Sequence, residues 1–147
     1  MLNKMMLTIA ITGTVLIGGC NTMPKAVMQQ QNLALLQNKH WTLTQIGATE
    51  YTAKTPVPTL QFDQATQRVS GMDGCNRIMG TYAIRNHQLS FGPLGSTRMH
   101  CPDQAQLTTQ FNDAMAKVAG FQVFGHTLKL LDRHGNPVLQ FTTENAQ

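Results

Sequence analysis

Short runs in which apolar and polar residues alternate dominate the chain from residue 40 onward. A period of two places every second side chain on the same face of a β-strand. The runs include Trp41 and Leu43, Leu60 and Phe62, Ile78 to Ile84, and Leu89 and Phe91. Because residues that favour turns separate these short runs, the pattern suits antiparallel hairpins rather than parallel strands joined by long crossovers.

The period changes between residues 102 and 118. Apolar residues recur there at the spacing of one helix face, at Leu107, Phe111, Ala114, Met115 and Val118. Proline and aspartate open this segment and glycine follows it, as is common at helix ends. Three strands are expected next, at 121–124, 127–131 and 138–141. The chain is therefore predicted to be α+β, a meandering antiparallel sheet packed with one amphipathic helix.

The N-terminus has the features of a secretory signal. Lys4 supplies a positive charge, and the apolar run 5–17 is shorter than the ~20 residues that span a bilayer. Ile17-Gly18-Gly19 before Cys20 resembles a bacterial lipobox, in which the cysteine thiol takes a diacylglycerol. We predict a lipoprotein signal peptide at 1–19 and lipidation, including palmitate, at Cys20; an ordinary signal peptide and an uncleaved anchor are the alternatives.

The residues after Cys20 predict location and domain limits. In enteric-type sorting, an Asp directly after the lipidated cysteine favours the inner membrane. This chain has Asn21 at that position, so we expect an outer-membrane anchor facing the periplasm. Residues 20–37 are rich in Gln and Asn and are predicted to be mainly a flexible tether, with a possible helical turn at its three leucines. The domain is predicted at 38–142 and a C-terminal tail at 143–147.

Length and composition exclude several classes of protein. A chain of 147 residues has room for one domain, and 41% hydrophobic with 12% charged residues argues against a disordered tail, a collagen or a coiled coil. When Lys4 is removed with the signal, the mature chain keeps ten basic and seven acidic residues, and neither kind forms a continuous run. This charge is too weak and dispersed to predict nucleic-acid binding.

Two segments carry a resemblance to a known family. They are Gly74-Cys75-Asn76-Arg77 and the run Ser-Thr-Arg-Met-His-Cys-Pro at 96–102. Together with Trp41 and the Gly-Thr-Tyr at 80–82, they resemble the META-domain family of HslJ-like envelope lipoproteins, over about residues 38–142. The resemblance implies a small secreted or lipid-anchored α+β domain without established catalytic activity. It also implies an association with envelope stress, drug tolerance or virulence.

Cys75 and Cys101 remain once Cys20 is lipidated. An even pair in an oxidising compartment predicts a disulfide closing a loop of about 27 residues, with two reduced buried thiols as the alternative. A zinc site that adds His100 and another histidine, or a cysteine nucleophile paired with histidine, is less favoured. The chain has no Cys-x₂-Cys or His-x₃-His pair. We expect no metal, no cofactor and no enzymatic activity.

Arg77 and Arg98 are the candidate ligand-binding residues, because each lies within three residues of a cysteine. A disulfide would gather their guanidinium groups at one end of the sheet to bind phosphate or carboxylate. The alternative is that they bond to nearby carbonyls. Four methionines are expected to fill gaps in the domain, at Met72, Met79, Met99 and Met115.

The expected function is therefore a lipid-anchored, non-enzymatic binding or interaction module. Its expected partners are the membrane, through the lipid on Cys20, and an envelope protein or small anionic ligand, but not nucleic acid. One alternative is an envelope assembly or stability factor that holds a protein client, for example at an open sheet edge. A Cys-dependent enzyme is the less favoured alternative.

Overall fold

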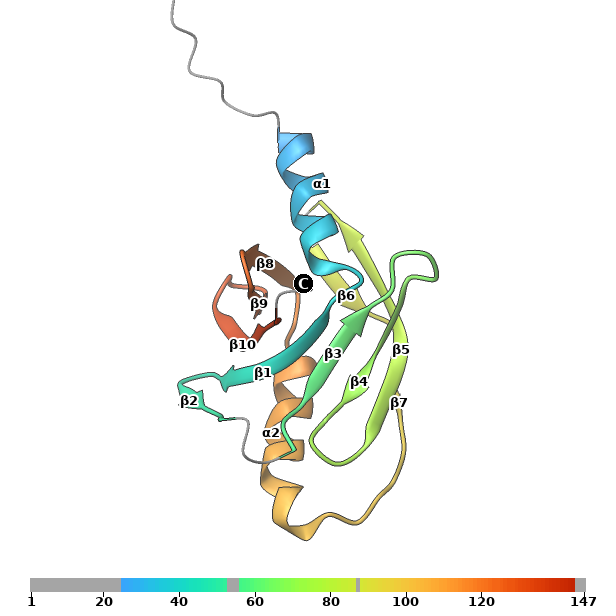
Figure 1. The fold of residues 1–147 in the computed structure, drawn as a ribbon, viewed down its shortest axis with the longest axis vertical. Helices are drawn as coiled ribbons and strands as arrows, with labels where there is room; N and C mark the ends of the chain where they lie inside the picture. Colours follow the sequence, from blue (N-terminus) through green and yellow to red (C-terminus); the bar gives the residue numbers. More distant parts are fainter. Residues whose placement is uncertain (1–24, 53–55, 87, 145–147) are drawn as a thin grey trace, which may run out of the picture.

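The computed structural model describes residues 25–52, 56–86 and 88–144, and its main feature is an antiparallel sheet that closes on itself (Figure 1). The closing contact joins β1 (His40–Ile46) to β10 (Pro137–Thr142), with Thr42 opposite Thr142. Between them the neighbours follow in the order β3 (Thr59–Phe62), β4 (Arg68–Met72), β5 (Arg77–Arg85), β6 (Gln88–Phe91), β8 (Gly120–Phe124) and β9 (Thr127–Leu131). Within the described residues, these eight strands form a closed barrel.

Two short strands lie outside this ring. β2 (Thr49–Glu50) pairs with β1, and β7 (Gly95–Ser96) pairs with the first half of β5. β6 and β8 meet through one residue pair, Gln88 with Gly120, so this is the narrowest junction between neighbouring strands of the ring.

Closure of the barrel corrects the predicted open, meandering sheet. The predicted antiparallel hairpins are present, but their first and last strands also pair with each other. Alternation within a strand indicates which face is buried and carries no information on which distant strand lies beside it. Closure pairs every strand of the ring on both sides, so the open sheet edge expected for docking a client is absent except where β6 and β8 share a single residue pair.

The predicted amphipathic helix is present as α2 (Ala105–Met115), which follows a short 3₁₀ turn, η1 (Pro102–Gln104). Its buried residues are four of the five predicted stripe residues, Leu107, Phe111, Ala114 and Met115. The fifth, Val118, lies beyond the end of the helix and is half-buried. The helix contacts β1 and β10, and the Phe111 ring packs edge-to-face on Phe141 with centroids 6.4 Å apart. In Figure 1, α2 lies at the lower end of the barrel.

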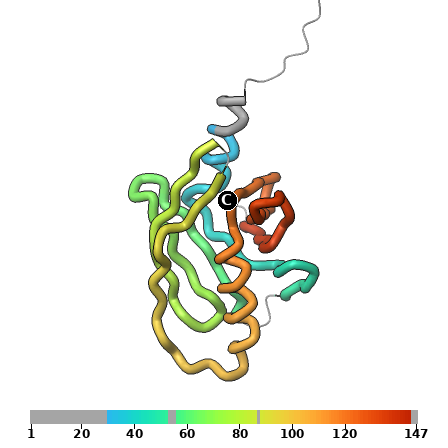
Figure 2. The backbone as a smooth tube through the Cα atoms, turned by 180° about the vertical axis from the view of Figure 1, so that it is seen from behind, coloured from blue at the N-terminus to red at the C-terminus, as the bar shows by residue number. Residues whose placement is uncertain are grey.

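A second helix, α1 (Lys25–Leu36), lies at the upper end (Figure 1). The helical turn expected at the three leucines is part of it, whereas the flexible tether expected for the rest of this segment is not found at Lys25–Leu36. The helix is held at its C-terminal end, where Leu36 is fully buried and its carbonyl accepts a hydrogen bond from the Trp41 indole, 2.9 Å. The neighbouring Gln37 amide donates to the Tyr82 hydroxyl at 2.6 Å. Figure 2 shows from behind that α1 lies next to the C-terminal strands, and it contacts β8.

The N-terminal predictions lie outside the described residues. The signal at 1–19, Cys20 and Asn21 all precede Lys25. Among the described residues, no helix combines the length and apolar character needed to cross a membrane.

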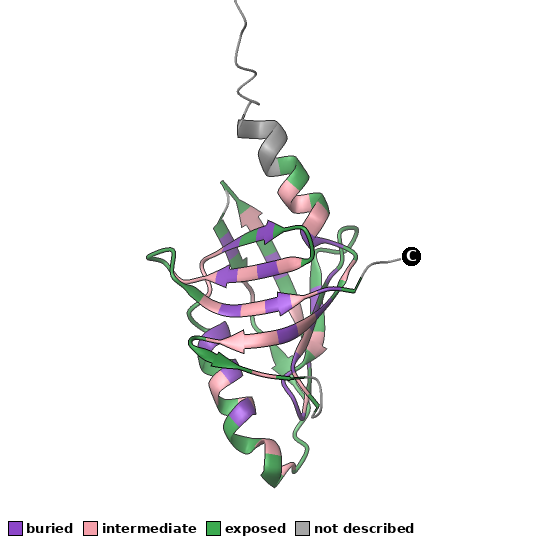
Figure 3. Ribbon diagram, turned by 60° about the vertical axis from the view of Figure 1, so that its left-hand side comes forward, coloured by how far each residue is buried: buried purple, intermediate pink, exposed green. Residues whose placement is uncertain are grey.

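The core fills the barrel interior, and the strands alternate between buried and exposed residues (Figure 3). On β5, Ile78 and Tyr82 face inward, whereas Arg77, Met79 and Thr81 face outward. The largest fully buried side chains are Trp41, Phe62, Phe111 and Phe141. One wall of the barrel therefore presents the odd-numbered residues of β5 to solvent.

Candidate functional site

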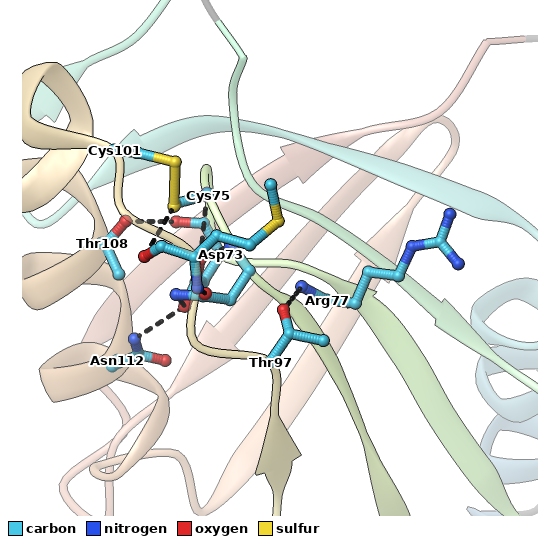
Figure 4. Close-up of a disulfide and its surroundings, with 9 residues drawn as sticks. Asp73, Cys75, Arg77, Thr97, Cys101, Thr108 and Asn112 are labelled. Carbon is cyan, nitrogen blue, oxygen red and sulfur yellow. Dashed lines mark hydrogen bonds between the residues drawn. A yellow bond between two sulfur atoms is a disulfide. The ribbon is translucent and has the colours of Figure 1, made fainter.

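The structure contains the predicted disulfide between Cys75 and Cys101, with Cα atoms 6.0 Å apart (Figure 4). It joins the turn between β4 and β5 to the residue before η1. Because neither sulfur is a thiol in this state, neither is available as a nucleophile or a thiolate ligand. Across the described ranges, no group of three or more His, Cys, Asp or Glu side chains is arranged to hold a metal.

Asp73 organises the same turn, and sequence reasoning did not single it out. The residue is only 1% exposed. One carboxylate oxygen accepts the backbone N–H groups of Cys75 and Asn76, at 3.0 and 2.6 Å. The other accepts the side-chain amides of Asn76 and Asn112, at 3.3 and 3.1 Å. Since Asn112 lies on α2, a hydrogen bond joins the turn to this helix, and the disulfide joins the same turn to the segment just before η1 (Figure 4).

The environment of Asp73 lowers its pKa. Burial of the carboxylate favours the neutral form and would raise the pKa, but the hydrogen bonds from Asn76, Cys75 and Asn112 together outweigh it. The sequence signal for this role was the Asp-Gly-Cys-Asn order. An Asp at the start of a turn commonly accepts the backbone N–H groups that follow it.

Replacing Asp73 by Asn is expected to lower the free energy of unfolding at neutral pH by about 1–3 kcal/mol, because an NH₂ group replaces one of the two accepting oxygens and the donors on that side lose their acceptor. A lowered pKa in the folded state stabilises the fold above the unfolded-state value of about 3.9. This stabilisation is lost as the pH falls through the folded pKa. The variant should therefore lose less stability than the wild type below about pH 4.

Urea unfolding at neutral pH and at several acidic pH values measures this difference. Asp113→Asn, at an exposed position of α2, is the matched control. Parallel stability profiles for Asp73→Asn and the wild type would contradict the assigned role.

Arg77 and Arg98 lie on neighbouring segments at the disulfide end of the barrel, and both are exposed. The Arg77 backbone N–H donates to the Thr97 hydroxyl, and the Arg77 carbonyl accepts the Thr97 N–H, each at 3.0 Å. Arg98 follows Thr97 directly. In Figure 4 the Arg77 guanidinium points away from the disulfide.

Neither guanidinium is engaged by the protein in the described part of the chain. The ion pair present there joins His134 to Asp132, and no hydrogen bond from the Arg77 or Arg98 side chain to a carbonyl is found among these residues. The alternative of local carbonyl bonding is therefore not what the structure has. No described residue therefore competes with a ligand for these two charges.

The segment that carries Arg98 is also held in place. The Met99 backbone N–H donates to the Asn76 side-chain oxygen at 2.7 Å. A small cavity of about 180 Å³ lies beside the bridge, lined by His100, Pro102, Thr108 and their neighbours. We call residues 73–77 and 97–101 the disulfide platform. It is a surface fixed by one disulfide and by the bonds of Asp73 and Asn76.

A larger cavity lies elsewhere and includes none of the predicted site residues. It measures about 730 Å³ and is lined by residues 38–40 and 42 together with His126, Thr143 and Glu144. Residues 145–147, which follow Glu144, are outside the described ranges.

The comparison with known families decides what kind of domain this is. The family model for the META domain matches residues 31–145 of the chain. The chain belongs to the META-domain family. The match starts within α1, which agrees with the burial of Leu36 and Gln37 in the META domain.

Solved structures share the fold of this META domain. An NMR structure of a protein from Burkholderia xenovorans is 25% identical, with a TM-score of 0.61, covering 98% of this chain and 99% of the other. A second NMR structure is 22% identical, with a TM-score of 0.58, covering 74% of this chain and 92% of the other. No curated protein matches the chain.

Proposed function

We propose that this META-domain chain is a lipid-anchored protein of the bacterial envelope that acts as a non-enzymatic binding module. The observation that carries the proposal is the pair of exposed arginines on the disulfide platform, Arg77 and Arg98, which form no ion pair with any other described residue. A surface held in one conformation before binding loses little entropy when a ligand arrives. The chemistry of the two guanidinium groups selects a carboxylate or phosphate.

The anchor is proposed at Cys20, in the outer membrane and facing the periplasm, and a role in stress or drug tolerance is part of this proposal. α1 begins five residues after Cys20, at the end of the barrel opposite the disulfide platform (Figure 1). A lipid on Cys20 would therefore leave the platform on the side of the barrel away from the anchor. Two or three acyl chains, at ~0.8 kcal/mol per buried CH₂, hold a protein durably in a bilayer.

Replacing Cys20 by Ser is expected to block lipidation and processing, because the acyl chain is attached through the thiol. The variant should retain its signal and lose partitioning into the detergent phase. Phase separation in Triton X-114 and mass spectrometry of the N-terminal peptide measure the two effects. Wild-type protein found wholly in the aqueous phase, without lipid mass, would overturn the anchor.

The binding role is tested on a soluble chain that begins at Asn21. Every residue of the core cluster lies between Leu36 and Phe141, so this chain keeps the complete folded unit. The ¹⁵N-labelled chain is titrated with inorganic phosphate and, separately, with hexaglutamate. For at least one probe, we expect amide shifts concentrated at 76–77 and 97–99. We also expect Arg77→Gln/Arg98→Gln to weaken binding of that probe roughly tenfold.

The matched control is Lys117→Gln/Arg133→Gln, which removes the same charge from exposed positions elsewhere. The control should change affinity by less than about twofold. An equal loss in both pairs would mean attraction by net charge alone. If neither phosphate nor hexaglutamate binds, the proposed function is also refuted.

A further inference from the structure

The outward face of β4 and β5 carries a strip of arginines and methionines. The two strands pair with Arg68 opposite Thr81, Ser70 opposite Met79 and Met72 opposite Arg77, and all six residues are exposed. Arg85, also exposed, ends β5. We call Arg68, Ser70, Met72, Arg77, Met79, Thr81 and Arg85 the arginine strip.

The charge of the arginine strip is not balanced by its surroundings. The strands from β3 to β7 contain no Asp or Glu, although four of the five arginines of the chain lie on them or, as Arg98, two residues beyond β7. The nearest acids in the connecting turns are engaged locally. Asp63 accepts the backbone N–H and the hydroxyl of Thr66, both at 2.7 Å, and Asp73 is buried in its own turn.

Three of the four methionines that were expected to fill gaps in the domain are exposed instead. Met72 is 38% exposed, Met79 50% and Met99 63%, whereas Met115 is buried. A single exposed apolar side chain is ordinary. Here, however, Met79 lies between Arg77 and Arg85 along β5, and Met72 lies opposite Arg77 at the end of β4. Met99 lies near this same end, where its N–H donates to Asn76. Enrichment in Arg and Met with depletion of Lys, Asp and Glu is the composition of protein–protein interface centres.

The spacing of the charges indicates the size of the partner. β5 is nine residues long, so Arg77 and Arg85 are separated by roughly 27 Å, and Arg68 lies level with Thr81 midway between them. The backbone distance from Arg77 to Arg85, roughly 27 Å, is too long for one phosphate or carboxylate to contact all three arginines. They suit an extended acidic surface. Clustered basic residues are typical of proteins that bind anionic bilayers, and these arginines are dispersed around methionines instead.

We propose that the arginine strip docks a partner protein that presents spaced carboxylates around an apolar centre. This inference rests on the proposed function and names the partner class, with the disulfide platform as the lower end of a longer interface. The arginines select the acidic partner, and the methionines adapt to its apolar side chains.

The test uses a peptide whose charges match the strip, Glu-Ser-Leu-Ser-Glu-Ser-Leu-Ser-Glu, in which the glutamates recur at the interval of the arginines. Binding to the chain from Asn21 is followed by fluorescence anisotropy and by ¹⁵N amide shifts. We expect shifts at Ser70, Met79 and Thr81. We also expect roughly tenfold weaker binding in Arg68→Glu/Arg85→Glu, two positions outside the disulfide platform.

Three controls decide the outcome. Lys117→Glu/Arg133→Glu makes the same change of charge elsewhere and should alter affinity by less than about twofold. A scrambled peptide of the same composition should bind more weakly. Vesicles of phosphatidylcholine with about one third phosphatidylglycerol should not bind the chain in the absence of its lipid.

Each contrary result overturns the inference. Equal losses in the two variants, equal binding of the scrambled peptide, no binding of the matched peptide, or binding to vesicles instead would refute a protein-docking strip. Suppose that Arg77→Gln/Arg98→Gln loses binding of hexaglutamate or phosphate, while Arg68→Glu/Arg85→Glu shows no loss of binding. Only the docking role of the arginine strip would then be refuted. The proposed function at the platform would then stand. The melting temperatures of the exposed-site variants confirm that each remains folded.

Discussion

Replacing Phe111 by Ala is expected to lower the free energy of unfolding by roughly 3–5 kcal/mol. Phe111 is fully buried on α2, and its ring contacts the ring of Phe141 on β10, the strand that closes the barrel. The substitution removes the apolar contacts and leaves a cavity where helix and barrel meet. Since a domain of this kind is stable by ~5–15 kcal/mol, the loss is a large share of the total.

Urea unfolding followed by circular dichroism measures the change. Gln106→Ala, at an exposed position of the same helix, is the matched control and should alter stability by less than about 0.5 kcal/mol. A denaturant midpoint that is the same for wild type and Phe111→Ala would show that the stripe of α2 does not support the barrel.

Removing the disulfide, by Cys75→Ser/Cys101→Ser, is expected to cost about 3 kcal/mol. The bridge joins residues 26 positions apart, and without it the unfolded chain gains the conformational freedom of that loop. The variant should still fold, because the hydrogen bonds of Asp73 continue to connect the turn to α2.

Thermal unfolding with and without reductant measures this effect on the wild type, and the serine variant, insensitive to reductant, is the control. The mass of periplasmically expressed protein after alkylation reports the redox state directly. Labelling of both cysteines without reductant, together with an unchanged melting temperature when reductant is added, would refute the bridge. The free-thiol alternatives, a nucleophile or a metal ligand, would then return.

The disulfide platform illustrates which parts of a site are accessible from sequence. The cysteine pair was predicted from the compartment and the even count, and the two arginines from their nearness to the cysteines. Asp73 was not identified, because its role depends on Asn112, a residue 39 positions away on a helix. The exposure of Met72 and Met79 was also missed, since a methionine in a strand has no pattern of its own that distinguishes core from surface.

The amino-acid sequence by itself determined the local elements of this protein. Period-two alternation defined the hairpins, and the 3.6-residue stripe defined α2, because both depend on neighbours within a few positions. Only the tertiary structure decided that the sheet closes and that α1 belongs to the domain. Closure depends on β1 meeting β10, with Thr42 opposite Thr142. The end of α1 is held by Trp41 and Tyr82. Such long-range pairings arise from how the buried faces fit together in space, which local periodicity does not encode.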